Sequence, residues 1–324
     1  MTRPPSERTA LELRGAILSG ETTARAACAS VLARIEAVGR ATGAVSECFE
    51  TSALAAAAAV DARLAAGEAP RALEGIPFTA KGNIATLEGI THAGSRFLET
   101  HRAVEEATAV RRLREAGAIL VGKTHCDEFA MGSSNENSAF GVVRNPWQLD
   151  RVPGGSSGGA SVLAAAVGGS VHLGSDTGGS IRQPAAYCGV TGVKPTYGTV
   201  SRSGLVAFGS SLDQIGPIAR DAKDASAFLE VMAGPDPRDG TTRTELNGDF
   251  LAGEIPRRIG IPRDYFPEAI EPETRAAVEA AIEVLRADGA KIVELDLPMT
   301  AHANACYQVV STAEASANLS RYDG

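Results

Sequence analysis

The sequence predicts an α/β protein, because segments with the apolar spacing of helices alternate with short apolar runs typical of strands. Two helical patterns lie within residues 7–38 and are separated by a Gly-Glu-Thr break at 20–22. A strand–helix–strand pattern covers residues 258–296. Because 44% of the 324 residues are apolar and 22% are charged, the chain can bury a large core. We expect one domain over residues 1–324.

The N-terminal part, residues 1–70, is expected to consist of helices that pack on the main body. Its third helix, over residues 52–66, is rich in alanine and ends at a glycine. Residues 71–220 are expected to form the core, which begins with a short strand that ends on Lys81. Residues 221–324 are expected to add the second part of the sheet and further helices.

Residues 104–116 predict a helix that leads into a buried strand at 118–121. The segment 117–124, GAILVGKT, also matches the G-x-x-x-x-G-K-[ST] pattern of phosphate-binding loops. Such a loop must curl so that its amide groups face the phosphates, whereas the residues between these glycines are an apolar, strand-forming run. We therefore expect Lys123 and Thr124 to end a strand, without a nucleotide site.

Two glycine-flanked serines, Ser156 and Ser180, bracket one apolar segment at 160–172 that has a helix-then-strand pattern. Flexible Gly/Ser linkers would not enclose packed elements in this way. Glycines allow several amide N–H groups to turn toward one point, which is how an oxyanion is held. A hydroxyl among such donors is a candidate nucleophile for acyl transfer if a nearby base can take its proton.

Composition and spacing argue against several other functions. A net charge of −8 and a pI near 5.3 are unfavourable for a chain that binds nucleic acid by itself. The five cysteines are scattered without Cys-x-x-Cys spacing, which indicates reduced residues in a cytoplasmic protein. The longest apolar run, residues 53–60, is too short to span a membrane. The acidic turn at 233–240 lacks the spacing of a calcium loop, so no metal is expected.

The base that would activate a serine is expected to be a lysine, because none of the five histidines lies in a glycine-framed turn. Residues 154–158 also fit G-x-S-x-G, the nucleophile elbow of another hydrolase class, which would make Ser156 the nucleophile. That elbow directly follows a strand, whereas Pro146 and Pro153 make the preceding residues resemble a loop. A serine–lysine system is therefore the preferred interpretation, with the elbow as its rival.

The stretch 151–184 resembles the signature of the amidase signature family, and residues 123–147, 174–217 and 313–323 carry further motifs similar to that family. The resemblance extends from about Leu73 onward and, more loosely, over the N-terminal helices. It implies the amidase signature fold, a mixed β-sheet flanked by helices on both faces. In the family the last motif is followed by a long further segment, so the fold is expected to be incomplete at its C-terminus, in a fragment or a truncated protein.

The resemblance implies a triad in which Ser180 is the nucleophile, Ser156 is a bridging serine that follows a cis peptide bond, and Lys81 is the final base. A lysine accepts a proton only when neutral, so its pKa must fall by several units from about 10.4. In the family this lysine is usually followed by Asp-Asn, whereas Gly82 follows it here. The remaining site residues that the resemblance implies are the oxyanion-binding Thr177, Gly178 and Gly179 and a substrate pocket of Met131, Gly132, Ser133 and Ser157.

The activity that the resemblance implies is hydrolysis of the side-chain amide of glutamine, with release of ammonia. The family branch with these motifs uses such a chain in a heterotrimer, whose B and C subunits use ATP to convert Glu-tRNA(Gln) to Gln-tRNA(Gln). No cofactor is therefore expected in this chain, and ATP, Mg²⁺ and most tRNA contacts are expected in a partner protein. The alternatives are a free-standing amidase that acts on small amides and a truncated, inactive remnant, which Gly82 and the early end of the chain favour.

Overall fold

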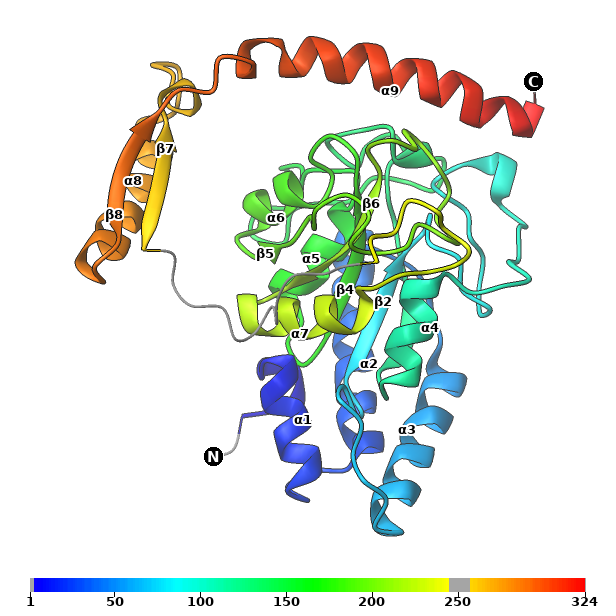
Figure 1. Cartoon of the computed structure of the whole chain (residues 1–324). Coiled ribbons are helices and arrows are strands. Elements are labelled where there is room, and N and C mark those ends of the chain that lie inside the picture. Colours follow the sequence, from blue (N-terminus) through cyan, green and yellow to red (C-terminus); the bar gives the residue numbers. More distant parts are fainter. Residues whose placement is uncertain (1–2, 245–256, 324) are drawn as a thin grey trace. The chain divides into compact units, whose positions relative to one another are not determined.

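The computed structural model describes residues 3–244 and 257–323 (Figure 1). Contacts divide the chain into two compact units, of which unit 1 comprises Met1–Leu251 with Glu314–Gly324 and unit 2 comprises Ala252–Ala313. This division differs from the single domain expected from the sequence. It follows the strand pairing, because each unit has a sheet of its own.

Unit 1 begins with the helices α1 (Ala10–Leu18), α2 (Ala24–Thr42) and α3 (Glu50–Ala65). The side chain of Thr9 accepts the N–H of Glu12 and the side chain of Glu12 accepts that of Thr9, so a capping box starts α1. Thr23 caps α2, and Gly43, with a φ of 72°, ends it. The helices predicted for the N-terminal part are thereby confirmed.

The strands of unit 1 are β1 (Val45–Cys48), β2 (Pro77–Lys81), β3 (Ile119–Thr124), β4 (Val171–Asp176), β5 (Thr191–Gly192) and β6 (Gln214–Ala219). Among the described residues they form one sheet in the order β1-β3-β2-β4-β6-β5. Strand β2 is parallel to β3 and β4, and the other neighbours are antiparallel, which confirms the mixed sheet. Because β3 is extended through Thr124, the segment 117–124 is not a phosphate-binding loop, as expected.

Helices cover both faces of this sheet (Figure 1). On one face, α4 (Thr108–Glu115) and α7 (Ala222–Met232) share a buried apolar core with β2 and β4. On the other face, α2, α3 and α5 (Gly158–Ala166) form a second core. Strand β3 contributes Leu120 to the first core and Val121 to the second, so its successive side chains are buried on opposite faces.

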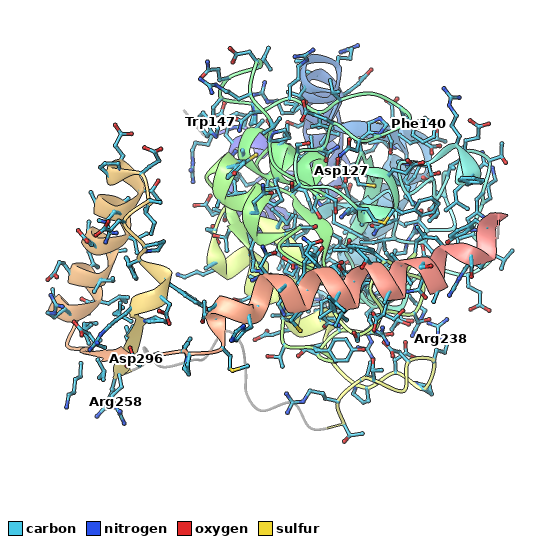
Figure 2. All side chains as sticks on the ribbon, turned by 90° about the horizontal axis from the view of Figure 1, so that it is seen from above. Asp127, Phe140, Trp147, Arg238, Arg258 and Asp296 are labelled. Carbon is cyan, nitrogen blue, oxygen red and sulfur yellow. The ribbon has the colours of Figure 1, made fainter. Side chains whose placement is uncertain are left out.

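Unit 2 is a strand–helix–strand element made of β7 (Arg258–Pro262), α8 (Pro272–Ala287) and β8 (Lys291–Leu295). Arg258 and Asp296, labelled in Figure 2, lie at the start of β7 and just after β8. The two strands are parallel and, in the described residues, pair with each other alone. The expectation that 221–324 adds the second part of the main sheet stays a prediction, since a strand–helix–strand crossover places β7 and β8 side by side but does not by itself decide which further strands they join.

The remaining elements are short apart from the last helix. They are the helices α6 (Arg182–Cys188) and α9 (Thr300–Asp323) and the 3-10 turns η1 (Pro5–Glu7), η2 (Arg96–Leu98), η3 (Glu128–Ala130) and η4 (Arg263–Tyr265). Helix α9 begins in unit 2 and ends in unit 1. None of the helices in the described part of the chain combines the length and the apolar character needed to cross a bilayer.

Candidate active site

The candidate site lies at the edge of the main sheet where β2 and β4 end. These strands are parallel neighbours, with Ala80 opposite Leu173, so their carboxyl ends share one edge. Strand β2 ends on Lys81 at this edge, and β4 is followed by the turn that carries Ser180. Helix α5 packs against β4 and starts directly after the turn that contains Ser156. Topology thus brings the predicted lysine and both serine turns together.

Lys81 is completely buried and its Nζ donates three hydrogen bonds. The acceptors are Oγ of Ser156 at 2.7 Å, Oγ of Ser175 at 2.9 Å and the carbonyl oxygen of Ser175 at 3.4 Å. The side-chain amide of Asn83 also donates to Oγ of Ser175, at 3.0 Å. Burial lowers the pKa of Lys81 to about 8, and nearby acidic groups, first Cys126 and then Asp127, oppose this decrease. A substantial fraction of Lys81 is therefore neutral near pH 8.

Ser156 is completely buried, and the peptide bond between Gly155 and Ser156 is cis. The N–H of Gly155 donates to Oε1 of Gln183 at 2.9 Å, which ties this turn to α6. A Cβ on Gly155 would lie 2.2 Å from Oδ2 of Asp127, so the backbone can approach this buried carboxylate only because residue 155 is glycine. Asp127, labelled in Figure 2, also accepts the N–H of Asn135 at 3.0 Å.

The turn that carries Ser180 is held by the carboxylate of Asp176. One oxygen accepts the N–H of Gly179 at 2.9 Å and the other accepts that of Ile181 at 3.0 Å, while the guanidinium of Arg182 binds both. Burial raises the pKa of Asp176, but the hydrogen bonds from Arg182 and Ile181 outweigh burial and lower it below the usual range. The carbonyl oxygen of Ser180 accepts the N–H of Ser157 at 3.1 Å, which joins the two serine turns directly.

Thr177, on the same turn, donates its hydroxyl proton to Oδ1 of Asp213 at 2.6 Å. Asp213 also accepts the N–H groups of Phe208, at 2.9 Å, and Gly209, at 3.2 Å. Burial raises the pKa of this carboxyl group, against the lowering effect of these hydrogen bonds. The expected oxyanion-binding segment is thus fixed at Thr177 by Asp213 and at Gly179 by Asp176.

The expected pocket residues divide into two groups. Met131 and Ser133 are exposed, and the carbonyl oxygen of Ser133 accepts the side-chain N–H of Gln183 at 2.9 Å. Gly132 packs against Asp127, which a Cβ at position 132 would contact at 2.3 Å. Ser157, in contrast, is completely buried, and its hydroxyl both donates to and accepts from the backbone of Ser175. In this structure Ser157 therefore fixes the end of β4.

Gly82, which departs from the expected Asp, lies under the imidazole of His92. A Cβ on Gly82 would be 2.4 Å from Cε1 and 2.7 Å from Nε2 of that ring. The N–H of Gly82 donates to Thr124 and its carbonyl oxygen accepts from Ala93, both at 2.9 Å. Burial lowers the pKa of His92 to about 3, so the ring is neutral. Position 82 is therefore small because a histidine ring occupies the space beside it.

The structural roles of several further residues of the site were not predicted from the sequence. These residues are Asn83, Asp127, Ser175, Asp176, Gln183 and Asp213. The carboxylates among them accept backbone N–H groups and so shape the turns without touching the proposed triad directly. A usable signal was present for Asp176, because this aspartate stands directly before the turn that carries Ser180 in the sequence.

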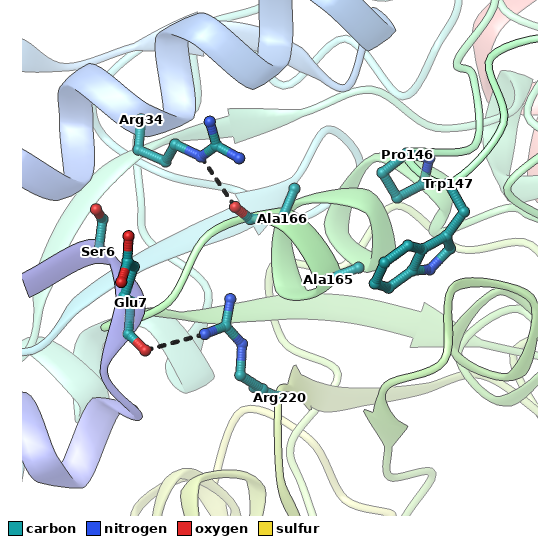
Figure 3. A pocket seen from close by; sticks show the side chains of 8 residues that line it. All are labelled: Ser6, Glu7, Arg34, Pro146, Trp147, Ala165, Ala166 and Arg220. Carbon is teal, nitrogen blue, oxygen red and sulfur yellow. Dashed lines mark hydrogen bonds between the residues drawn. The ribbon is translucent and has the colours of Figure 1, made fainter. Parts of the chain in front are cut away.

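A separate pocket of about 470 Å³ lies at the other end of α5 (Figure 3). Arg34 donates to the carbonyl oxygen of Ala166 at 3.1 Å and Arg220 donates to that of Glu7 at 3.2 Å, while Trp147 lines the opposite wall. None of the triad residues lines this pocket. Within the described ranges, no group of three His, Cys, Asp or Glu side chains could hold a metal ion.

Residues 26–324 match the family model described as Amidase. The chain belongs to the amidase family. The chain is 51% identical, over 317 residues, to the A subunit of glutamyl-tRNA(Gln) amidotransferase from Roseiflexus sp. (strain RS-1), an alignment that covers 97% of the chain and 65% of that protein. The curated relatives it matches are thus longer, and the chain spans slightly less than two thirds of their length.

Solved structures support the fold of this family for the chain. The A subunit of glutamyl-tRNA(Gln) amidotransferase from Thermotoga maritima superposes with a TM-score of 0.79 at 39% identity, covering 97% of this chain and 65% of that one. The native peptide amidase from Stenotrophomonas maltophilia gives a TM-score of 0.89 at 35% identity, covering 98% and 68%. The amidase signature fold expected from the sequence is thereby confirmed.

Proposed function

We propose that this chain hydrolyses the side-chain amide of glutamine with Ser180, Ser156 and Lys81, as the ammonia-supplying A subunit of a glutamyl-tRNA(Gln) amidotransferase. The observation that carries the proposal is the buried 2.7 Å hydrogen bond between Lys81 and Ser156, beside the turn that carries Ser180. Identity of about half of all residues to proteins of that name supports the choice of amide.

In this reaction Oγ of Ser180 attacks the amide carbon of the substrate, and its proton passes through the hydroxyl of Ser156 to neutral Lys81. The carbonyl oxygen becomes an oxyanion, for which the proposed donors are backbone N–H groups of the 177–180 turn other than that of Gly179, which is bonded to Asp176. When the C–N bond breaks, the proton returns along the same route to the leaving nitrogen, so that ammonia departs. Water then cleaves the ester on Ser180 by the same steps and releases glutamate.

The released ammonia would serve an amidation carried out by partner subunits in the cytoplasm. We place ATP, Mg²⁺ and most contacts to Glu-tRNA(Gln) in the B and C subunits of such a heterotrimer. The net charge of −8 supports this division, because a chain that holds tRNA by itself needs clustered basic residues. No cofactor is required for the hydrolytic step in this chain.

The test measures glutamate and ammonia formed from glutamine and, separately, covalent labelling by a fluorophosphonate probe that reacts with activated serines. Ser180→Ala should abolish both signals, and Ser156→Ala and Lys81→Met should lower them by several orders of magnitude. Labelling that persists on Ser156 in the Ser180→Ala variant would instead support the G-x-S-x-G assignment, with Ser156 as nucleophile. Ser320→Ala, far from the triad in the sequence, serves as the control for expression and folding.

The likeness to a peptide amidase favours one other candidate, a free-standing amidase. This candidate predicts that the purified chain cleaves simple amides without partner subunits and shows no preference for glutamine. Comparing glutamine with a small aliphatic amide, with and without the B and C subunits, distinguishes the two functions. Preference for glutamine that increases with the partners would exclude the free-standing amidase.

A further inference from the structure

The end of helix α9 that belongs to unit 1 holds a loop beside the candidate site. The carboxylate of Glu314 accepts the N–H of Ser211 at 2.9 Å. The side-chain amide of Asn318 donates to the carbonyl oxygen of Phe208 at 3.1 Å and to Oγ of Ser210 at 2.9 Å. Because residues four apart lie on one face of a helix, Glu314 and Asn318 act together on the same segment, residues 208–211.

The segment 208–211 in turn contacts the turn that carries the nucleophile. Asp213 accepts the N–H groups of Phe208 and Gly209 and also the hydroxyl proton of Thr177, so one carboxylate joins both pieces of backbone. Gly209 lies between Thr177 and Glu314. A Cβ at that position would be 3.2 Å from Cγ2 of Thr177 and 3.6 Å from Oε2 of Glu314.

The same end of α9 is anchored at a second place. The ring of Tyr322 stacks on that of Phe129, with 5.0 Å between centroids and 30° between planes. Leu319 packs in the same apolar cluster, with Ala93 and Leu98. Phe129 stands two residues before Met131 of the proposed substrate pocket. The helix end is therefore anchored at two places, and Glu314 and Asn318 hydrogen-bond to residues 208–211.

We infer that Glu314 and Asn318 are positioning residues. By holding residues 208–211 and, through them, Asp213, they set the turn that carries Thr177 and its amide donors for the reaction of Ser180. The inference rests on the proposed function. Neither residue is placed in contact with substrate. Their effect is expected on the reaction step, because donors for an oxyanion act in the transition state and are sensitive to displacements of about 0.5 Å.

The test compares Glu314→Ala, Glu314→Gln and Asn318→Ala in the chain assembled with its partner subunits. Ser320→Ala is the matched control, because Ser320 lies on the same helix and its hydroxyl donates to the carbonyl oxygen of Ala317, within that helix. Three quantities are measured for each variant. They are kcat and KM for glutamine, the rate constant for labelling of Ser180 by a fluorophosphonate, and the Tm.

The two alanine variants should lower kcat and the labelling rate at least about tenfold, with KM changed less than about twofold. Glu314→Gln should keep at least about half of the activity, because its amide oxygen can still accept the N–H of Ser211. Ser320→Ala should leave both rates unchanged.

Three results overturn the inference. In the first, the alanine variants lower Tm while both rates stay at the wild-type value. In the second, Glu314→Gln is as impaired as Glu314→Ala. In the third, KM alone increases. A wild-type protein that neither hydrolyses glutamine nor labels at Ser180 contradicts the proposed function itself, whereas a wild-type protein that labels without hydrolysing glutamine still tests the inference through the labelling rate.

Discussion

The Nζ of Lys81 donates a 2.7 Å hydrogen bond to Oγ of Ser156, a residue 75 positions further along the chain. Burial removes water from this ammonium group and lowers its pKa to about 8. The proton that Lys81 donates in this bond is the one it must lose before it can act as a base. Its protonation state therefore decides in which direction a proton can move between the two residues.

We expect kcat/KM for amide hydrolysis to rise about tenfold per pH unit at low pH and to level off above about pH 8. The value of kcat/KM rises with pH because only neutral Lys81 accepts a proton, and the neutral fraction increases as the pH rises through the pKa. The measurement is kcat/KM from about pH 6 to pH 9.5 at constant ionic strength. Lys81→Arg should be inactive throughout, since a guanidinium stays protonated; a flat wild-type profile below pH 8 would count against Lys81 as the base.

The second prediction concerns Asp176, which holds the turn of Ser180. Asp176→Asn replaces one acceptor oxygen by a donor that faces backbone N–H groups, so we expect labelling of Ser180 to slow by about 100-fold. The free energy of unfolding should fall by about 1–3 kcal/mol. Because the pKa of Asp176 is lowered, its stabilisation is present above the usual carboxyl pKa and is lost as the pH falls through the lowered value.

The matched control for this variant is Asp61→Asn. Asp61 also accepts two backbone N–H groups, those of Ala24 at 2.6 Å and Arg25 at 3.0 Å, but it does so at the start of α2. The Asp61→Asn variant should therefore lower the free energy of unfolding without slowing the labelling of Ser180. Thermal melts and labelling rates on both variants separate the two effects, and equal loss of labelling in both would mean that Asp176 acts through stability alone.

The sequence predicts most of the elements of unit 1, because apolar periodicity is a local signal. Strand β6 was not predicted, since Gly216 and Pro217 interrupt its apolar run. The strand forms nevertheless, because pairing with β4, whose partner residues such as His172 and Ile218 are distant in the sequence, supplies the hydrogen bonds that local propensity does not. The separate sheet of β7 and β8 was missed for a related reason, since a strand's partner depends on contacts distant in sequence.

At the site, the glycine-framed serines and the strand that ends on Lys81 could be found from the sequence, because turns and strand ends have local signatures. Roles that depend on how side chains are oriented in the folded chain could not be predicted. Asp213 accepts a hydrogen bond from the hydroxyl of Thr177, and the buried hydroxyl of Ser157 bonds to the end of β4. The meaning of Gly82 was also hidden, since it depends on the position of the His92 ring.

The third prediction concerns the packing of Gly82 against the ring of His92. Gly82→Ala would place a Cβ 2.4 Å from the His92 ring, and hydrogen bonds from Gly82 to Thr124 and from Ala93 fix the backbone on both sides. The ring cannot easily move, because Nδ1 accepts the N–H of Gly94 at 2.8 Å. We therefore expect the free energy of unfolding to fall by about 1–3 kcal/mol, as overpacked cores do.

Gly82→Ala could destabilise the fold through a clash with the His92 ring or through the backbone conformation at position 82. The double variant Gly82→Ala/His92→Ala distinguishes these two causes. Removing the ring makes room for the new methyl group, so the double variant should be less destabilised than the sum of its single variants, by at least about 0.5 kcal/mol. Gly15→Ala is the control, because its Cβ would meet no atom within 4 Å and it lies inside α1. Urea unfolding of the four variants measures the coupling, and strict additivity would show that the histidine ring is not what keeps residue 82 small.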